Sequence, residues 1–197
     1  MTFRAALQNA VFLGIPAVIY ALVVRRKGAT TLSDIAARLG LVRGTRRAWL
    51  IALAACVPTA LAGAYASMRT QTFSGSALAG FVDAPPTARV LAAVVAYGLI
   101  ATGVPEELLF RGLIAGALFR RWSFWKANVL QASIFVLPHL VILLVAPRLW
   151  PVVIAAPLAF SLFAGWLRHS SGSIFPSALV HAVTNMASAL AVLRWSR

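Results

Sequence analysis

Three apolar stretches of the chain carry the kinds of ionisable and amide side chains that hydrolytic enzymes use. They are Glu106, Glu107 and Arg111 within GVPEELLFRG, His139 within FVLPH, and His181 and Asn185 within HAVTN. A charged group at the centre of a bilayer costs about 2.5–3.5 kcal/mol on insertion scales, so an ionisable residue there is a candidate for function. These six residues are therefore the first candidates for a site.

The spacing to Arg111 predicts different roles for the two adjacent glutamates. Glu107 and Arg111 are four residues apart with the acid first, which is the favourable order for an ion pair along a helix. Glu106 points about 100° away on the same helix and lacks that partner. A carboxylate that is removed from water without a positive partner is a stronger base, as general-base catalysis requires. We therefore predict that Glu106 is the base and that Glu107 and Arg111 support the site.

The other two stretches supply groups that could surround this base. His181 and Asn185 are four residues apart and present an imidazole and an amide on one helix face. Gln131 and His139 are expected to share a face of their own segment. Taken singly, each residue has a structural explanation; Asn185, for example, could bond a neighbouring helix for about 0.6–2 kcal/mol. Taken together, they predict one cavity lined by a carboxylate, two imidazoles and an amide.

The chain lacks the residues that several hydrolytic mechanisms require. No HExxH motif occurs, which argues against a zincin-type metalloprotease. Asp34 and Asp83 fall in predicted loops, so no intramembrane aspartyl dyad is available. The Ser-Gly-Ser at 171–173 could pair with His181, but the chain lacks the glycine-flanked serine within a helix of rhomboid-type serine proteases. Hydrolysis by a glutamate base with histidine and asparagine stabilisers remains.

The elements that position these residues are predicted to be membrane-spanning helices. The chain is 61% hydrophobic and 11% charged, whereas a soluble domain is roughly a quarter charged. Apolar segments lie near 5–24, 48–68, 88–118, 127–146, 150–167 and 174–193. We expect an all-α, polytopic membrane bundle of about six transmembrane helices. The third segment is too long for one straight crossing, and Pro105 predicts a kink or break there.

The net charge of +14 is explained by loops at the membrane surface. Basic residues lie mostly between apolar segments, as in Arg25-Arg26-Lys27 and Arg120-Arg121, which is typical of cytoplasmic loops facing anionic lipid. We therefore expect a multi-pass protein of the cell membrane, with the lipid bilayer as a partner and no nucleic acid. The loop segment TTLSDIAARLGL predicts an amphipathic surface helix that Ser33 caps.

Together, EELLFR, FVLPH and HAVTN resemble the three motifs of the CPBP family (CAAX proteases and bacteriocin-processing enzymes), which includes type II CAAX prenyl endopeptidases. The family pattern is EExxxR, then FxxxH, then HxxxN or HxxxD, on successive membrane helices. Glu106, Glu107 and Arg111 fill the first motif, Phe135 and His139 the second, and His181 and Asn185 the third. The resemblance covers about residues 90–190. It predicts N-terminal helices at 1–87 and a catalytic core at 88–193.

The resemblance implies an intramembrane endopeptidase that cleaves a membrane-embedded or lipidated peptide. Glu106 would activate water, His139 would hold or polarise it, and His181 and Asn185 would stabilise the oxyanion, a role worth roughly 3–4 kcal/mol per donor. We expect no metal, because a zinc ion on Glu106, His139 and His181 would leave no obvious base. If zinc is bound, those three residues are its expected ligands.

Other functions are compatible with the same residues. With six predicted helices the chain is shorter than eight-helix CAAX enzymes, so specificity for a prenylated CAAX peptide is not assumed. A non-catalytic bacteriocin-immunity or scaffold protein could retain the motifs for packing, with Gly112 and Gly116 allowing close helix contact. A proton-coupled transporter would also use intramembrane glutamate and histidine, although the motif segments show no internal repeat.

Overall fold

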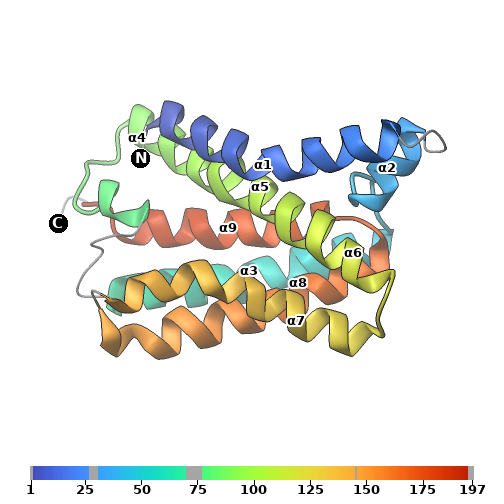
Figure 1. Cartoon of the computed structure of the whole chain (residues 1–197). Coiled ribbons are helices and arrows are strands. Elements are labelled where there is room, and N and C mark those ends of the chain that lie inside the picture. The colour runs from blue at the N-terminus through green and yellow to red at the C-terminus, as the bar shows by residue number, and fades with distance from the viewer. Residues whose placement is uncertain (1, 27–30, 70–76, 145, 195–197) are drawn as a thin grey trace.

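The computed structural model is a bundle of helices that run side by side along one long axis (Figure 1). It describes residues 2–26, 31–69, 77–144 and 146–194, and no strand occurs among them. The all-α prediction is therefore confirmed. Lys27 and residues 70–76, which belong to two of the predicted loops, lie outside the described residues.

Five helical stretches of the described chain are long and apolar enough to cross a membrane: Phe3–Arg26, Arg46–Arg69, Ala88–Phe119, Phe124–Leu144 and Val152–Ser171. The first two are α1 (Phe3–Arg26) and α3 (Arg46–Arg69). The third joins α4 (Ala88–Ala96), η2 (Tyr97–Gly103), α5 (Val104–Glu107), η3 (Leu108–Ala115) and α6 (Gly116–Phe119). The others contain α7 (Phe124–Val136) with η4 (Leu137–Leu144), and η6 (Pro151–Ala155) with α8 (Ala156–Ser171). Short 3₁₀ turns, η1 (Ala77–Gly80) and η5 (Pro147–Leu149), lie in connections. The chain is a multi-pass membrane protein.

The sixth predicted crossing is α9 (Phe175–Ala191), a shorter helix of 17 residues. It packs against α3, η2, α4, α5 and α8, and Figure 1 shows it in the middle of the bundle. Small residues on its buried side, including Ala178, Ala182 and Ala189, allow these neighbours to approach closely. The helix that carries His181 and Asn185 is therefore the central element of the fold.

The irregularity expected at Pro105 takes the form of wide turns instead of a break. The π-helical segments η2 and η3 flank the single turn of α5, and π turns of this kind often mark functional sites. Pro105 has no N–H to donate to the carbonyl of Ala101, four residues earlier. That carbonyl accepts a hydrogen bond from the Asn9 side chain of α1 at 2.6 Å. The N-terminal helix thus stabilises the backbone just before the two glutamates.

The predicted amphipathic helix is α2 (Leu32–Arg38), but its cap is Thr31 and not Ser33. The Thr31 hydroxyl accepts a hydrogen bond from the Asp34 backbone N–H, and the Asp34 carboxylate accepts one from the Thr31 backbone N–H. These Thr31 hydrogen bonds lower the pKa of Asp34 below its ordinary value. This reciprocal capping box satisfies two backbone donors at the helix start, which a cap at Ser33 would not.

The C-terminal end of α2 packs closely on the third membrane stretch. A Cβ added at Gly112 would lie 2.6 Å from the Leu39 carbonyl oxygen, and one at Gly116 would lie 2.9 Å from that of Arg38. From α8, the Arg168 guanidinium donates a hydrogen bond to the same Arg38 carbonyl at 3.0 Å. The glycine pair therefore permits close packing as predicted, with the end of α2 as its partner.

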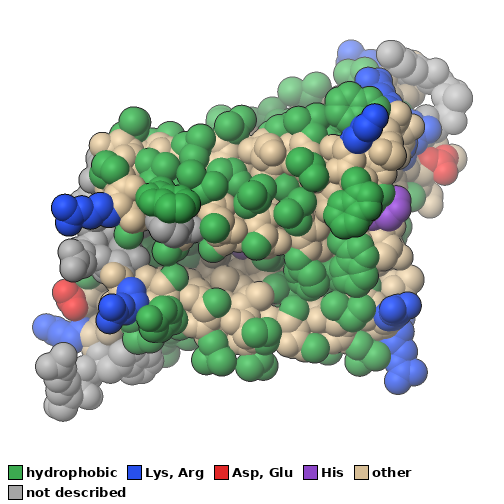
Figure 2. Space-filling model, turned by 90° about the horizontal axis from the view of Figure 1, so that it is seen from below, with side chains coloured by type: hydrophobic (Ala, Val, Ile, Leu, Met, Phe, Trp, Pro, Cys, Tyr) green, Lys and Arg blue, Asp and Glu red, His purple; other side chains and the backbone are tan. Residues whose placement is uncertain are grey.

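The molecular surface has the charge distribution of a membrane protein. Figure 2 shows hydrophobic side chains over the middle of the molecule and most Lys and Arg side chains towards its two ends. One end joins the α1–α3 connection to the α6–α7 turn and carries Arg25, Arg26, Arg38, Arg43, Arg46, Arg47, Arg120, Arg121 and Lys126. The fold thus brings together the two basic loops that were predicted to be cytoplasmic.

Candidate active site

The three sequence motifs come from neighbouring helices of the bundle. Glu106 and Glu107 form the last two residues of α5, and α9, which carries His181 and Asn185, packs against both α5 and η2. His139 lies in η4, the 3₁₀ continuation of α7. The π turns on either side of α5 set the direction in which the two glutamate side chains leave the helix.

Glu107 is fully buried and has a partner on each carboxylate oxygen. Its Oε1 atom lies 2.8 Å from Nη1 of Arg111 and 3.1 Å from Nδ1 of His181. Its Oε2 atom accepts a hydrogen bond from the Ser177 hydroxyl at 2.7 Å. Two of these partners come from α9, so Glu107 joins the third membrane stretch to the central helix. A buried carboxylate with partners on both oxygens is expected to be structural.

Arg111 is fully buried beside Glu107 and is surrounded largely by aromatic rings. Its guanidinium carbon lies 4.3 Å from the ring centroid of Phe135 and 5.2 Å from that of Phe160. No hydrogen-bond acceptor among the described residues meets its three nitrogens with good geometry. The cation is therefore stabilised by the charge of Glu107 and by two ring faces. Removing either charge would leave the other buried and unpaired.

Glu106 differs from its neighbour in exposure and in partners. Its side chain is 20% exposed, whereas that of Glu107 is 0% exposed. Oε2 of Glu106 lies 3.8 Å from Nε2 of His181. No described residue makes a hydrogen bond to the Glu106 carboxylate. Of the two adjacent acids, Glu107 is enclosed in a polar network, and Glu106 has no hydrogen-bond partner among the described residues.

His181 lies between the two glutamates, with one ring nitrogen facing each. Oε1 of Glu107 is paired with Arg111 and acts as an acceptor, so in the 3.1 Å contact Nδ1 of His181 is assigned as the N–H donor. In a neutral ring, Nε2 then has a free lone pair close to Glu106. In a protonated ring, Nε2 is a donor. The sequence assigned His181 to the oxyanion, a role that only the protonated ring can fill.

His139 is linked to His181 by the ring of Phe135, which contacts both histidine rings. Its Nδ1 atom lies 3.0 Å from the Phe135 carbonyl oxygen, and its ring centroid lies 5.1 Å from that of Phe135. The other edge of Phe135 contacts the His181 ring at 6.0 Å between centroids. No direct contact joins His139 to Glu106 among the described residues. In that part of the chain, no three His, Cys, Asp or Glu side chains are grouped as metal ligands would be.

Asn185 is held by a residue that the sequence reasoning missed. Its side-chain N–H group donates a hydrogen bond to the Thr102 hydroxyl at 2.9 Å. The hydroxyl in turn lies 3.0 Å from the Tyr97 carbonyl oxygen, so that it can donate along its own helix. Thr102 is one turn before Glu106, which places the amide beside the glutamate helix. Local spacing carries no signal for this contact, because the two residues are 83 positions apart.

Ser177 is the second site residue that the sequence analysis did not identify, although its spacing from His181 could have indicated it. It precedes His181 by four residues, as His181 precedes Asn185, so all three lie on one face of α9. In contrast, Gln131 was expected on the face of His139 but bonds to α8 instead. The chain changes to 3₁₀ geometry at Leu137, with three residues per turn, yet His139 still contacts Phe135 four residues earlier. That Gln131 shares this face stays a prediction.

Comparison with known proteins agrees with this arrangement. No curated protein and no solved structure is significantly similar to the chain. A family model described as type II CAAX prenyl endopeptidase Rce1-like matches residues 88–187. The matched region begins at α4 and contains Glu106, Glu107, His139, His181 and Asn185. It spans more than half of the chain, which therefore belongs to the Rce1-like type II CAAX prenyl endopeptidase family.

Proposed function

We propose that this protein is an intramembrane endopeptidase in which Glu106 activates the water that attacks a peptide bond. The observation that carries this proposal is the contrast between the two adjacent glutamates. Glu107 has partners on both oxygens, whereas Glu106 is partly exposed, accepts no hydrogen bond from a described residue, and has Nε2 of His181 at 3.8 Å. A general base must be within hydrogen-bond reach of the proton that it removes. Glu106 meets that condition for a water beside His181.

The reaction follows from these positions. A water bound between Oε2 of Glu106 and Nε2 of His181 gives a proton to Glu106 while its oxygen bonds to the peptide carbonyl carbon. The carbonyl oxygen becomes an oxyanion, which the amide of Asn185 stabilises. Glu106 then passes the proton to the leaving nitrogen as the carbon–nitrogen bond breaks. The products are a carboxylic acid and an amine, and Glu106 returns to its starting state. The proton left on the acid then passes to the amine, which gives a carboxylate and an ammonium group.

The remaining residues position these groups. Glu107 holds His181 through Nδ1, so that Nε2 faces the water. Thr102 fixes one N–H of Asn185 and leaves the other free for the oxyanion. His139, whose Nδ1 is occupied by the Phe135 carbonyl, has Nε2 free to contact the same water or the substrate. We assign Arg111 to a supporting role, because its guanidinium pairs with Glu107 at 2.8 Å.

The proposed substrate is a peptide that is embedded in or tethered to the membrane by a lipid, such as a prenylated CAAX sequence. Two observations support this class of substrate. The chain belongs to a family of prenyl endopeptidases, and the glutamates lie within a stretch that is long and apolar enough to span the membrane. The cell membrane is the proposed location.

The experiment uses the purified protein in proteoliposomes with two fluorogenic peptides, one farnesylated at a CAAX cysteine and one anchored by an apolar helix. We expect cleavage of at least one, and Glu106→Gln to reduce it by about 10²–10⁴-fold. Asp34→Asn is the matched control, because it also replaces an acid by an amide but lies in the α2 cap. Full cleavage by Glu106→Gln would contradict the mechanism and favour a scaffold or immunity role. Proton flux without cleavage would indicate a transporter.

A further inference from the structure

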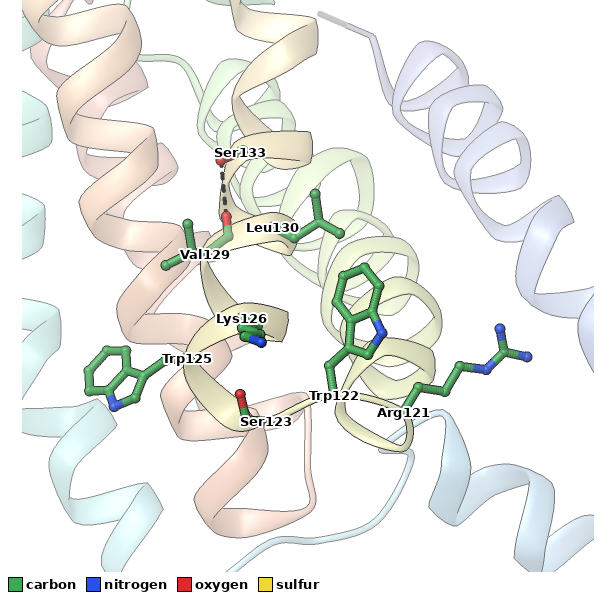
Figure 3. Close-up of a pocket in the computed structure, with 8 residues that line it drawn as sticks. All are labelled: Arg121, Trp122, Ser123, Trp125, Lys126, Val129, Leu130 and Ser133. Carbon is green, nitrogen blue, oxygen red and sulfur yellow. Dashed lines mark hydrogen bonds between the residues drawn. The ribbon is translucent and has the colours of Figure 1, made fainter.

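A hollow on the outside of α7 lies well away from the glutamates. Its lining includes Arg121 and Trp122 from the turn before α7, and Trp125, Lys126, Val129 and Ser133 from α7 itself. Figure 3 shows these residues following the first turns of the helix, with the Trp122 and Trp125 rings on either side of Lys126. Arg121 is fourteen residues beyond Glu107 on a largely helical path, which corresponds to roughly 20 Å. The cationic end of the hollow is thus separate from the proposed peptidase site, and Ser133, at the other end, is on the exposed side of α7.

One end of this hollow is cationic and lacks acidic partners. Arg121 and Lys126 are both exposed, and no described carboxylate lies within ion-pair distance of either. The whole chain contains four acidic residues, Asp34, Asp83, Glu106 and Glu107, and none of them lines the hollow. Two unpaired cations in one recess favour an anionic ligand.

The other end of the hollow is apolar. Val129 is 53% exposed, and the hydroxyl of Ser133 is occupied by a hydrogen bond to the Val129 carbonyl at 3.0 Å. From Lys126 to Ser133 this surface extends about 10 Å along α7, inside a helical stretch that can span the membrane. A ligand that fits the whole hollow must therefore have an anionic head and a hydrocarbon chain.

The two tryptophans place the cationic end at the membrane interface. Trp122 is 50% exposed and Trp125 is 70% exposed. Exposed tryptophan rings are enriched at the level of lipid head groups, where their apolar bodies and polar N–H groups are both satisfied. The same end of the bundle carries most of the described basic residues, as a surface facing anionic lipid does.

We propose that this hollow is a binding site for one anionic phospholipid. Lys126 binds its phosphate head group between the rings of Trp122 and Trp125, and Arg121, on the other side of Trp122, adds a second positive charge beside the head group (Figure 3). An acyl chain lies along Val129 and Ser133. The site selects anionic over zwitterionic lipid because a choline or ethanolamine group would bring a third positive charge into a recess without carboxylates. This inference does not depend on the peptidase activity.

The test is a native mass spectrometry titration of the full chain in detergent with phosphatidylglycerol and with phosphatidylcholine. We expect one tightly retained phosphatidylglycerol and no comparable phosphatidylcholine. At about 1 kcal/mol per basic residue near an anionic surface, Arg121→Gln with Lys126→Gln should weaken the first lipid by roughly tenfold or more. The matched control is Arg46→Gln with Arg47→Gln, which removes the same charge from exposed positions at the same end of the bundle. It should weaken binding by less than about threefold.

Further measurements in the same titration identify the ligand and its position. Ser133→Trp fills the apolar end without changing charge and should also reduce phosphatidylglycerol retention, with thermal unfolding showing that the variant is folded. Excess inorganic phosphate should not displace the lipid, whereas displacement would indicate a simple phosphate site. Equal losses in the two double variants would show attraction by net charge alone and would overturn the proposal. Equal retention of both lipids by the unmodified chain would overturn it as well.

Discussion

Two buried polar clusters among the described residues differ in whether every group has a partner. The glutamine cluster consists of Asn128, Gln131 and Ser161, all nearly or fully buried between α7 and α8. Gln131 donates hydrogen bonds at 2.9 Å to the Asn128 side chain and to the Ser161 carbonyl oxygen, and accepts one from the Ser161 hydroxyl at 3.3 Å. The Asn128 amide donates to the Leu162 carbonyl at 3.0 Å. This cluster is closed.

The glutamate cluster is closed on one side only. Glu107 is satisfied by Arg111, Ser177 and His181, in the manner of the glutamine cluster. Next to it, Glu106 is partly exposed and Nε2 of His181 faces it without a hydrogen bond. A fully paired polar network stabilises packing and specifies one arrangement of helices, whereas unpaired groups can bind water and substrate. We therefore propose a packing role for the glutamine cluster and a catalytic role for the open edge of the glutamate cluster.

The largest expected effect lies at that open edge. Replacing His181 by alanine removes the group that orients the water, and turnover should fall by about 10²–10⁴-fold. The loss of a partner for Glu107 should also lower the free energy of unfolding by about 1–3 kcal/mol. The control is His169→Ala, since His169 is exposed at the end of α8 against Phe119 and Phe124. Unchanged turnover in His181→Ala would show that the edge is not catalytic.

The next effect is on stability and lies on the closed side of the glutamate cluster. Arg111→Met retains much of the side-chain volume but leaves Glu107 buried without its cation, and should lower the free energy of unfolding by about 3–5 kcal/mol. Chemical unfolding in detergent micelles measures this change. Arg148→Met, at an exposed position, is the matched control. A loss below about 1 kcal/mol in Arg111→Met would mean that the pair is dispensable.

A substitution in the glutamine cluster should lower the stability of the protein without changing its peptidase activity. Gln131→Leu leaves partners in α7 and α8 unsatisfied and should lower the free energy of unfolding by about 1–3 kcal/mol. Turnover per folded molecule should stay within about twofold, because the cluster makes no hydrogen bond to the glutamate cluster. Peptide cleavage and unfolding are measured on the same preparation. A large loss of turnover here would remove the distinction between the two clusters.

The smallest effect concerns the positioning of Asn185. Thr102→Val keeps the shape of the side chain but removes the acceptor for the Asn185 amide. The loss of about 0.5–1.5 kcal/mol in the transition state should reduce kcat by roughly two- to tenfold and leave KM unchanged. Thr102→Ser should restore kcat, because it restores the hydroxyl. Thr59→Val controls for loss of a helix-internal threonine bond, since the Thr59 hydroxyl bonds only within α3. A change in KM alone would assign Thr102 to substrate binding.

The spacing of residues along the chain predicted those features of the fold and site that involve residues of a single helix. The approach of Arg111 to Glu107 follows from four-residue spacing, and the all-α membrane bundle follows from apolar segment length. The Thr31 cap could also be predicted from the sequence, because Thr31 and Asp34 have the spacing of a capping box. The predicted cap, Ser33, has Ala36 at the corresponding position, which cannot complete one. Contacts between distant segments had no such signal. The bonds from Asn185 to Thr102 and from Asn9 to Ala101 depend on how α9 and α1 pack, which periodicity does not specify.

Changes in helix geometry account for the other differences. Extrapolation along an α-helix placed Gln131 and His139 on one face, but the helix changes to 3₁₀ geometry at Leu137, between the two residues. The π turns around α5 likewise replace the break that Pro105 was expected to cause. Sequence patterns assume a uniform helix, and both departures from uniform α-helix geometry lie outside what such patterns specify. Each of these places is close to a proposed site residue.

The most direct test of the account compares the two adjacent glutamates in one experiment. Glu106→Gln and Glu107→Gln are each assayed for peptide cleavage and for the free energy of unfolding in the same detergent. We expect Glu106→Gln to lose about 10²–10⁴-fold in turnover with its stability unchanged, and Glu107→Gln to lose about 3–5 kcal/mol of stability. Retained cleavage in Glu106→Gln, or the larger loss of stability at Glu106, would contradict the assignment.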